Sequence, residues 1–203
     1  MTERPILFSG AMVRAILAGQ KTQTRRIIKP SPPRVMEAPQ GHEFSVAGHD
    51  HRCPYGQPGD RLWVRETWRP VMEAWRSFVE YAAEGPTLDN IHRDLMAPLN
   101  RLALRFPGAR KDRHSEVWHP SIHMPRWASR ILLEVKAVRV ERLQDISEGD
   151  ARAEGVEPRI VSHGPPELKG YVLGFKDLWR EINGAESWAA NPWVWVIEFE
   201  RVQ

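Results

Sequence analysis

The stretch Ile131–Val156, "ILLEVKAVRVERLQDISEGDARAEGV", carries the most regular pattern in the chain. Apolar and charged side chains alternate over 131–143, and this period of two predicts a long β-strand with one buried face. Ser147 then stands three residues before Asp150, so the pattern after the strand predicts a short capped helix that ends at Gly155. The other elements are placed around this strand-to-helix unit.

Two further periodic stretches lie on its C-terminal side. Leu173–Ile182, "LGFKDLWREI", repeats apolar side chains at helical spacing and is followed by Asn183-Gly184, which predicts an amphipathic helix. Trp193–Val202, "WVWVIEFERV", is rich in aromatic and β-branched residues and predicts the final strand.

On the N-terminal side, the chain predicts a strand, a helix and a second strand. Pro5–Phe8 is short and apolar, Ser9 is a suitable N-cap, and Gly19 is a suitable glycine stop. Lys21–Ile28 carries Thr and Ile at strand-like positions and is followed by Pro30.

The middle of the chain contains less regular structure. After Gly59, Leu62, Val64 and Glu66 share one face of a predicted strand, and Ser77–Ala82 is predicted to pair with that strand. Residues from about 30 to 58 are rich in proline, glycine and histidine and have no sustained period. Residues from about 85 to 130 show some helical periodicity at first but end in the loop-like "HPSIHMPRWASR", and the whole stretch is interpreted as a second insertion.

These patterns predict an α+β fold: one domain over residues 1–203, with a small β-barrel, short peripheral helices and two irregular insertions at about 30–58 and 85–130.

Composition and charge restrict the class of protein. The 203 residues contain 29 Lys and Arg against 26 Asp and Glu, yet no acidic residue occurs between Arg4 and Met36, a window that holds seven basic residues. Such a local charge favours an anionic partner such as nucleic acid or a nucleotide, although a solvated basic face explains it equally well. The single Cys53, the absence of an apolar leader and the absence of a membrane-length apolar run predict a cytoplasmic protein without membrane contact.

Four motifs in this order resemble the ASCH family, in particular its longer phage- and prophage-borne members. They are "ILAGQKTQTRR" at 16–26, "PGDRLWV" at 58–64, "ISEGDARAEGV" at 146–156 and "WVWVIEFERV" at 193–202. The resemblance implies a PUA-like β-barrel with a cleft for nucleobases or RNA.

A bacterial branch of small ASCH proteins removes the acetyl group from 4-N-acetylcytidine with a Lys, a Thr and a Glu. Through the "KTQTRR" segment and the end of the "ARAEG" segment, the resemblance implies Lys21, Thr24 and Glu154 as the catalytic residues here, with Arg26 at the matching basic position. This chain departs from the small enzymes in its length and in Arg25, which stands where they carry an apolar residue.

The chemistry of such a trio leaves two arrangements open. A Thr hydroxyl needs an adjacent base, and Lys21 can serve only if its pKa is lowered by burial or by the neighbouring Arg25 and Arg26. Glu154 would instead keep Lys21 charged, in which case Lys21 would stabilise the oxyanion and Glu154 would be the base. In a regular strand Lys21 and Thr24 point to opposite faces, so they converge only if Lys21 belongs to the turn after Gly19 or a bulge intervenes.

Other side chains are candidates for substrate or nucleic-acid binding because cations and aromatic rings can hold phosphates and bases. These candidates are Arg25, Arg26, Trp63, Arg65 and Trp68. His49, His51 and Cys53 are metal-type ligands but lack the paired spacing of zinc sites, so neither a metal nor another cofactor is expected.

The leading functional hypothesis is therefore an amidohydrolase, or a related hydrolase, that acts on a modified nucleoside, nucleotide or RNA base. A non-catalytic module that binds RNA or a modified base is the second hypothesis, and a ribonuclease is the third. The sequence contains no signal for a protein partner, for the oligomeric state or for the accepted modification.

Overall fold

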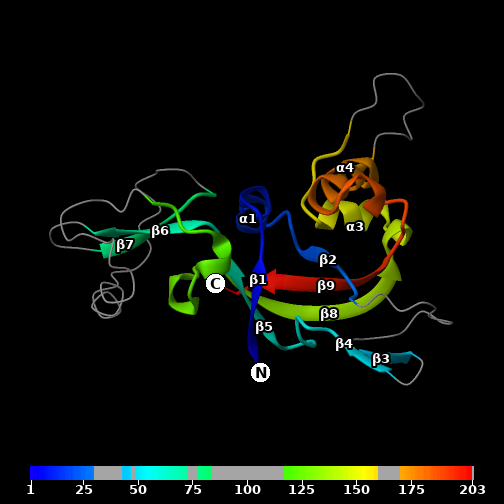
Figure 1. Cartoon of the computed structure of the whole chain (residues 1–203), viewed down its shortest axis with the longest axis horizontal. Coiled ribbons are helices and arrows are strands. Elements are labelled where there is room, and N and C mark those ends of the chain that lie inside the picture. Colours follow the sequence, from blue (N-terminus) through cyan, green and yellow to red (C-terminus); the bar gives the residue numbers. More distant parts are fainter. Residues whose placement is uncertain (30–42, 47–48, 73–76, 84–116, 160–169, 203) are drawn as a thin grey trace. The chain divides into compact units, whose positions relative to one another are not determined.

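The computed structural model describes residues 1–29, 43–46, 49–72, 77–83, 117–159 and 170–202 (Figure 1). The strands are β1 (Glu3–Leu7), β2 (Gln23–Ile27), β3 (Glu43–Val46), β4 (His49–Arg52), β5 (Arg61–Arg65), β6 (Trp68–Met72), β7 (Ser77–Tyr81), β8 (Leu132–Arg142) and β9 (Trp193–Arg201). The α-helices are α1 (Gly10–Leu17), α3 (Glu148–Ala153) and α4 (Tyr171–Asn183). Short 3₁₀ turns are η2 (Ser121–His123), η3 (Arg126–Ala128), η4 (Leu143–Asp145) and η6 (Ala185–Ser187).

The main sheet has five strands in the order β1-β5-β8-β9-β2, and two hairpins, β3-β4 and β6-β7, stand apart from it. Strand β9 runs antiparallel to both β8 and β2, with Arg25 opposite Val196 and Ile27 opposite Val194. The described chain is therefore a small α+β fold, as predicted. The predicted strands over 131–143 and 193–202 are confirmed as β8 and β9.

The chain divides into two compact units. Unit 1 comprises Met1–Arg4, Ala15–Leu62 and Leu133–Val202, and unit 2 comprises Pro5–Arg14 and Trp63–Leu132. The predicted insertion at 85–130 falls in unit 2, where residues 84–116 lie outside the described part. The insertion at 30–58 falls in unit 1; its described residues include the β3-β4 hairpin, a regular element that the sequence did not predict.

In unit 1, helices α3 and α4 pack against β9 around a buried apolar cluster (Figure 1). The cluster consists of Leu143, Ile146, Ala151, Phe175, Trp179, Val194 and Val196. The capping box predicted for the short helix is present, because the Ser147 hydroxyl accepts from the Asp150 amide and the Asp150 carboxylate accepts from the Ser147 amide. The predicted amphipathic helix begins two residues early, at Tyr171, where the Glu148 carboxylate accepts from the first backbone amides of α4.

In unit 2, the predicted pairing of Ser77–Ala82 with the strand that holds Leu62 and Val64 is wrong. Leu62 and Val64 alternate with half-buried neighbours as predicted, but the strand ends at Arg65 and a new strand, β6, begins at Trp68. Strand β7 pairs with β6 rather than β5, with Tyr81 opposite Trp68. At this break, the Glu66 amide donates to the Met124 sulfur at 3.3 Å. No helix in the described ranges is long and apolar enough to cross a membrane.

Candidate functional site

Lys21 and Glu154 are 133 residues apart in the sequence and form a buried ion pair in unit 1. The Lys21 ammonium donates to Glu154 Oε2 at 2.7 Å and to the Glu154 backbone carbonyl at 2.8 Å. The Lys21 side chain is 0% exposed and that of Glu154 is 4% exposed. The two predicted residues are thus in direct contact, held by two hydrogen bonds that the Lys21 ammonium donates.

The backbone at both residues explains this contact. Gly19 has a φ of +71° and ends α1, and the Lys21 amide donates to the Ala15 carbonyl, so Lys21 belongs to the turn after the helix. Gly155 has a φ of +75°, and a Cβ added there would lie 2.7 Å from Lys21 Cβ. Only a residue without a Cβ lets the end of α3 approach Lys21 this closely.

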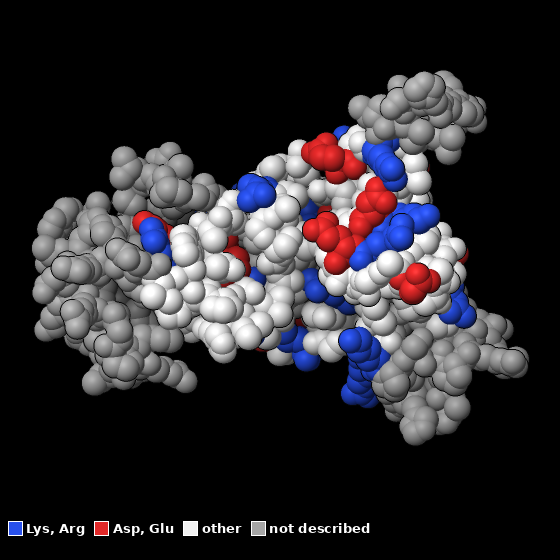
Figure 2. Space-filling model, turned by 45° about the horizontal axis from the view of Figure 1, so that its top comes forward, with Lys and Arg blue, Asp and Glu red and all other residues white. Residues whose placement is uncertain are grey.

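Arg25 extends the pair into a larger charged network. Its guanidinium lies 3.4 Å from Glu154 Oε1, 3.1 Å from a Glu141 oxygen and 3.4 Å from an Asp150 oxygen. Arg139 also binds Asp150 and Glu141, so each of these two carboxylates has two cationic partners. Figure 2 shows acidic and basic side chains gathered on the face that carries α3 and α4.

The network shifts the pKa values of Lys21 and Asp150, among others. Burial lowers the pKa of Lys21 from its usual 10.5; the Glu154 carboxylate opposes that shift, and the cations Arg26 and Arg25 add to it. Burial of Asp150 opposes its charge, but the hydrogen bond from Ser147 and the charges of Arg25 and Arg139 outweigh this and lower the pKa of the carboxyl. Lys21 is therefore easier to deprotonate than an ordinary lysine.

Thr24 does not join this cluster. It lies on β2, where successive side chains point to opposite faces of the sheet, and its neighbour Arg25 points toward Glu154. Thr24 pairs with Ile197 and is 3% exposed. The structure thus brings two of the three implied catalytic residues together and leaves the third on the other face of the strand.

Of the five predicted binding residues, two belong to unit 1 and three to unit 2. Arg25 is buried in the charged network, and Arg26 is half-buried with its guanidinium 5.8 Å from the Tyr55 ring centroid. In unit 2, Arg65 lies 5.4 Å from the Trp63 ring and donates to the Ile122 carbonyl.

The prediction that Trp68 binds a base is wrong. Its side chain is completely buried in the core of unit 2 with Val79, Tyr81 and Met124, so it has no free face on which a base could stack. The Trp68 ring lies in the core because Trp68 begins β6 and pairs with Tyr81 of β7. The sequence pattern did not predict this strand pairing.

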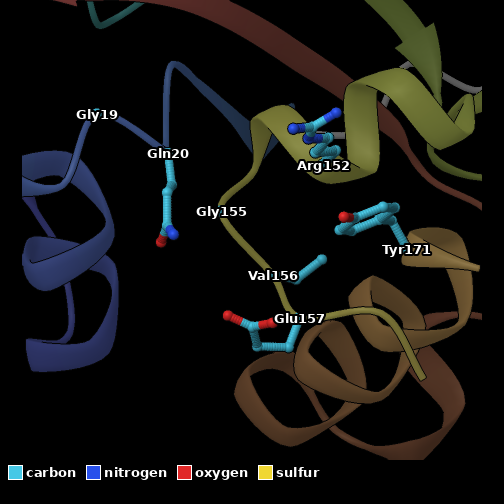
Figure 3. Close-up of a pocket in the computed structure, with 7 residues that line it drawn as sticks. All are labelled: Gly19, Gln20, Arg152, Gly155, Val156, Glu157 and Tyr171. Atoms are coloured by element: carbon cyan, nitrogen blue, oxygen red, sulfur yellow. The ribbon is translucent and has the colours of Figure 1, made fainter. Parts of the chain in front are cut away.

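A pocket of about 280 Å³ lies beside the ion pair in unit 1 (Figure 3). Its lining residues are Gly19, Gln20, Arg152, Gly155, Val156, Glu157 and Tyr171. Gln20 directly precedes Lys21 and Gly155 directly follows Glu154, so chain neighbours of both residues of the pair form part of the pocket lining. Sequence reasoning did not assign these residues to a pocket, although the adjacency of Gln20 and Gly155 to the two motif residues was an available signal; nothing local pointed to Tyr171.

The described residues do not include a group of three or more His, Cys, Asp or Glu placed to hold a metal ion. The side chains of His49 and His51 lie outside the part that can be described. Burial raises the pKa of the Cys53 thiol to about 11, which disfavours the thiolate that metal coordination requires. Comparisons with protein-family profiles, with curated proteins and with solved structures find no match to this chain.

Proposed function

We propose that this chain is an ASCH-type hydrolase with a PUA-like barrel, acting on an acylated or otherwise modified nucleoside, nucleotide or RNA base such as 4-N-acetylcytidine. The observation that carries the proposal is the buried contact between Lys21 and Glu154 next to a pocket. The antiparallel order β8-β9-β2, with α3 and α4 packed on β9, is compatible with such a barrel.

The geometry favours Glu154 as the general base and Lys21 as the group that stabilises the oxyanion. Glu154 would accept a proton from water as the water oxygen attacks the acyl carbon, and the Lys21 ammonium would bind the resulting oxyanion. Collapse of this intermediate breaks the bond from carbon to the cytosine nitrogen, which takes up the proton from Glu154. The products are the free amine and the carboxylic acid, which then loses its proton to solvent as the carboxylate. The lowered pKa of Lys21 helps it release a proton if it, rather than Glu154, activates the water.

Water serves as the nucleophile in this scheme because Thr24 points away from the pair. Lys21 has no exposed side-chain area, so a substrate can reach its ammonium only if the pocket wall at Gly155 and Val156 moves aside. The proposal therefore includes a local opening at this short segment.

The test is incubation with 4-N-acetylcytidine, with cytidine release followed by chromatography. We expect turnover to be lost in Lys21→Ala and Glu154→Gln and retained in Thr24→Ala. Lys136→Gln is the matched charge control, because Lys136 is a 44% exposed residue on β8. Full activity of either Lys21→Ala or Glu154→Gln would overturn the mechanism, and loss of activity in Thr24→Ala would restore the threonine as nucleophile.

The second candidate function is a binding module for RNA or a modified base without catalysis. It is favoured by the burial of Lys21 and by the position of Thr24 on the opposite face. A labelled RNA added to the same assays separates the candidates. Binding that weakens steeply with salt, without turnover, favours the module, whereas cleavage of the RNA favours a ribonuclease.

A further inference from the structure

Four polar side chains around the pocket have no partner elsewhere in the described part of the chain. Among the residues the structure describes, neither a hydrogen bond nor an ion pair forms at the side chains of Gln20, Arg152, Glu157 and Tyr171. Arg25, in the adjacent network, contacts three carboxylates. Gln20, Arg152 and Glu157 are exposed and Tyr171 is half-buried, so within the described residues the pocket gathers polar groups that a ligand can reach, beside a region where the charged groups are paired.

These four groups differ in what they can bind. The Arg152 guanidinium only donates and is always charged, so it suits an anion such as phosphate. The Glu157 carboxylate only accepts, so it suits O–H or N–H donors such as ribose hydroxyls or an exocyclic amine. The Gln20 amide can do both, and the Tyr171 ring can stack on a base.

The lining residues come from different sides of the pocket. In Figure 3, Gln20 approaches from the α1 side and Tyr171 from the α4 side, with the Gly155–Glu157 segment between them. Val156 adds apolar surface in the same segment. The volume of about 280 Å³ lies just below the usual range for small-molecule pockets, about 300 to 1,000 Å³, which suits a single nucleotide better than an oligonucleotide.

We propose that this pocket binds one nucleoside monophosphate, with its phosphate at Arg152, its hydrogen-bond donors at Glu157 and its base against Tyr171. The inference rests on the proposed function, because it assigns the substrate class to the site that Lys21 and Glu154 would serve. It makes Arg152 the residue that distinguishes a nucleotide from a free nucleoside.

The test is equilibrium binding by titration calorimetry with cytidine 5′-monophosphate, cytidine and inorganic phosphate. We expect the nucleotide to bind about tenfold tighter than cytidine, the gain typical of one hydrogen-bonded charged contact. Arg152→Gln should remove this difference and leave the affinity for cytidine unchanged. Glu157→Gln should weaken both ligands while preserving the effect of the phosphate.

Lys136→Gln is again the matched control, since it removes one exposed cation away from the pocket lining. Equal affinity for cytidine and its monophosphate, or an unchanged preference in Arg152→Gln, would overturn the proposal. A 5′-phosphorylated oligocytidine that binds tighter than the mononucleotide, with the same dependence on Arg152, would overturn the assignment to a single nucleotide.

Failure of the pocket assignment and failure of the proposed hydrolase function give different results. If the chain does not release cytidine from its acetylated form but still shows the Arg152-dependent phosphate preference, the hydrolase proposal fails and the nucleotide pocket stands. If acetylcytidine is hydrolysed but phosphate has no effect on binding, the pocket assignment fails alone. Glu154→Gln, which should lose turnover and keep nucleotide binding, checks that the two readouts are independent.

Discussion

Replacement of Gly155 by Ala tests how closely the end of α3 must approach Lys21. A Cβ at this position would lie 2.7 Å from Lys21 Cβ and 2.9 Å from Ala15 Cβ, closer than carbon atoms pack in proteins. Neither neighbour is the end of a flexible side chain, so the backbone itself must shift. Overpacking of this kind costs about 1 to 3 kcal/mol.

The φ of +75° at Gly155 adds a second cost, because a residue with a Cβ in the left-handed region loses about 1 to 2 kcal/mol. The total expected loss for Gly155→Ala is therefore about 2 to 5 kcal/mol in the free energy of unfolding. Gly19→Ala is a matched control. Gly19 has a similar φ of +71°, but nothing lies within 4 Å of its added Cβ, so only the backbone cost applies.

The assay is urea unfolding followed by tryptophan fluorescence for the wild type and both variants. With a urea dependence of about 2 kcal/mol per molar, the midpoint of Gly155→Ala should lie about 0.5 to 1.5 M below that of Gly19→Ala. Equal midpoints for the two variants would show that the contact between Gly155 and Lys21 is not tight and would refute the reasoning. Because the chain has two compact units, the comparison uses the transition that both variants share.

Three further predictions follow from buried or capped polar groups. Arg130 donates two 3.0 Å hydrogen bonds to the buried Glu66 carboxylate, so Arg130→Ala should lower the free energy of unfolding by about 3 to 5 kcal/mol. A loss below about 1 kcal/mol would contradict a buried pair. Glu154→Ala removes the carboxylate that opposes the lowered pKa of Lys21, so the pKa of Lys21 in the folded state should fall further below its usual 10.5. Between these two pKa values the unfolded state binds one more proton than the folded state, so the free energy of unfolding should rise with pH toward 10.5 more steeply than in the wild type. Parallel pH curves of the urea midpoints would refute this. Ser147→Ala removes the cap of α3 and should cost about 1 kcal/mol in thermal unfolding, whereas an unchanged melting temperature would show that the cap is dispensable.

Local patterns in the sequence predicted the parts of the fold that depend on neighbouring residues. The alternation over 131–143 specified β8 because an 11-residue strand with one buried face needs that period. Ser147 and Gly155 specified the ends of α3 because capping and positive φ are properties of single residues. Gly19 likewise specified the turn that contains Lys21.

The remaining features depend on where strands begin and what covers them. Whether Thr24 shares a face with Lys21 depends on the residue at which β2 starts, and the structure starts it at Gln23. Burial of Arg25 depends on three carboxylates that come from distant segments of the chain. Hydropathy assigns an arginine to the surface, so no local signal reveals that this one is enclosed.

Burial of the Lys21–Glu154 pair costs free energy, and this cost needs an explanation. Removing two charges from water costs several kcal/mol per ion, and well-packed apolar side chains of similar size are often as stable or more stable in such positions. Stability alone therefore does not account for an ion pair with a fully enclosed ammonium, placed beside a pocket whose polar groups lack partners in the described chain. The proposed hydrolase function gives one account of this cost, because a buried ammonium held beside a pocket is already positioned to bind an oxyanion.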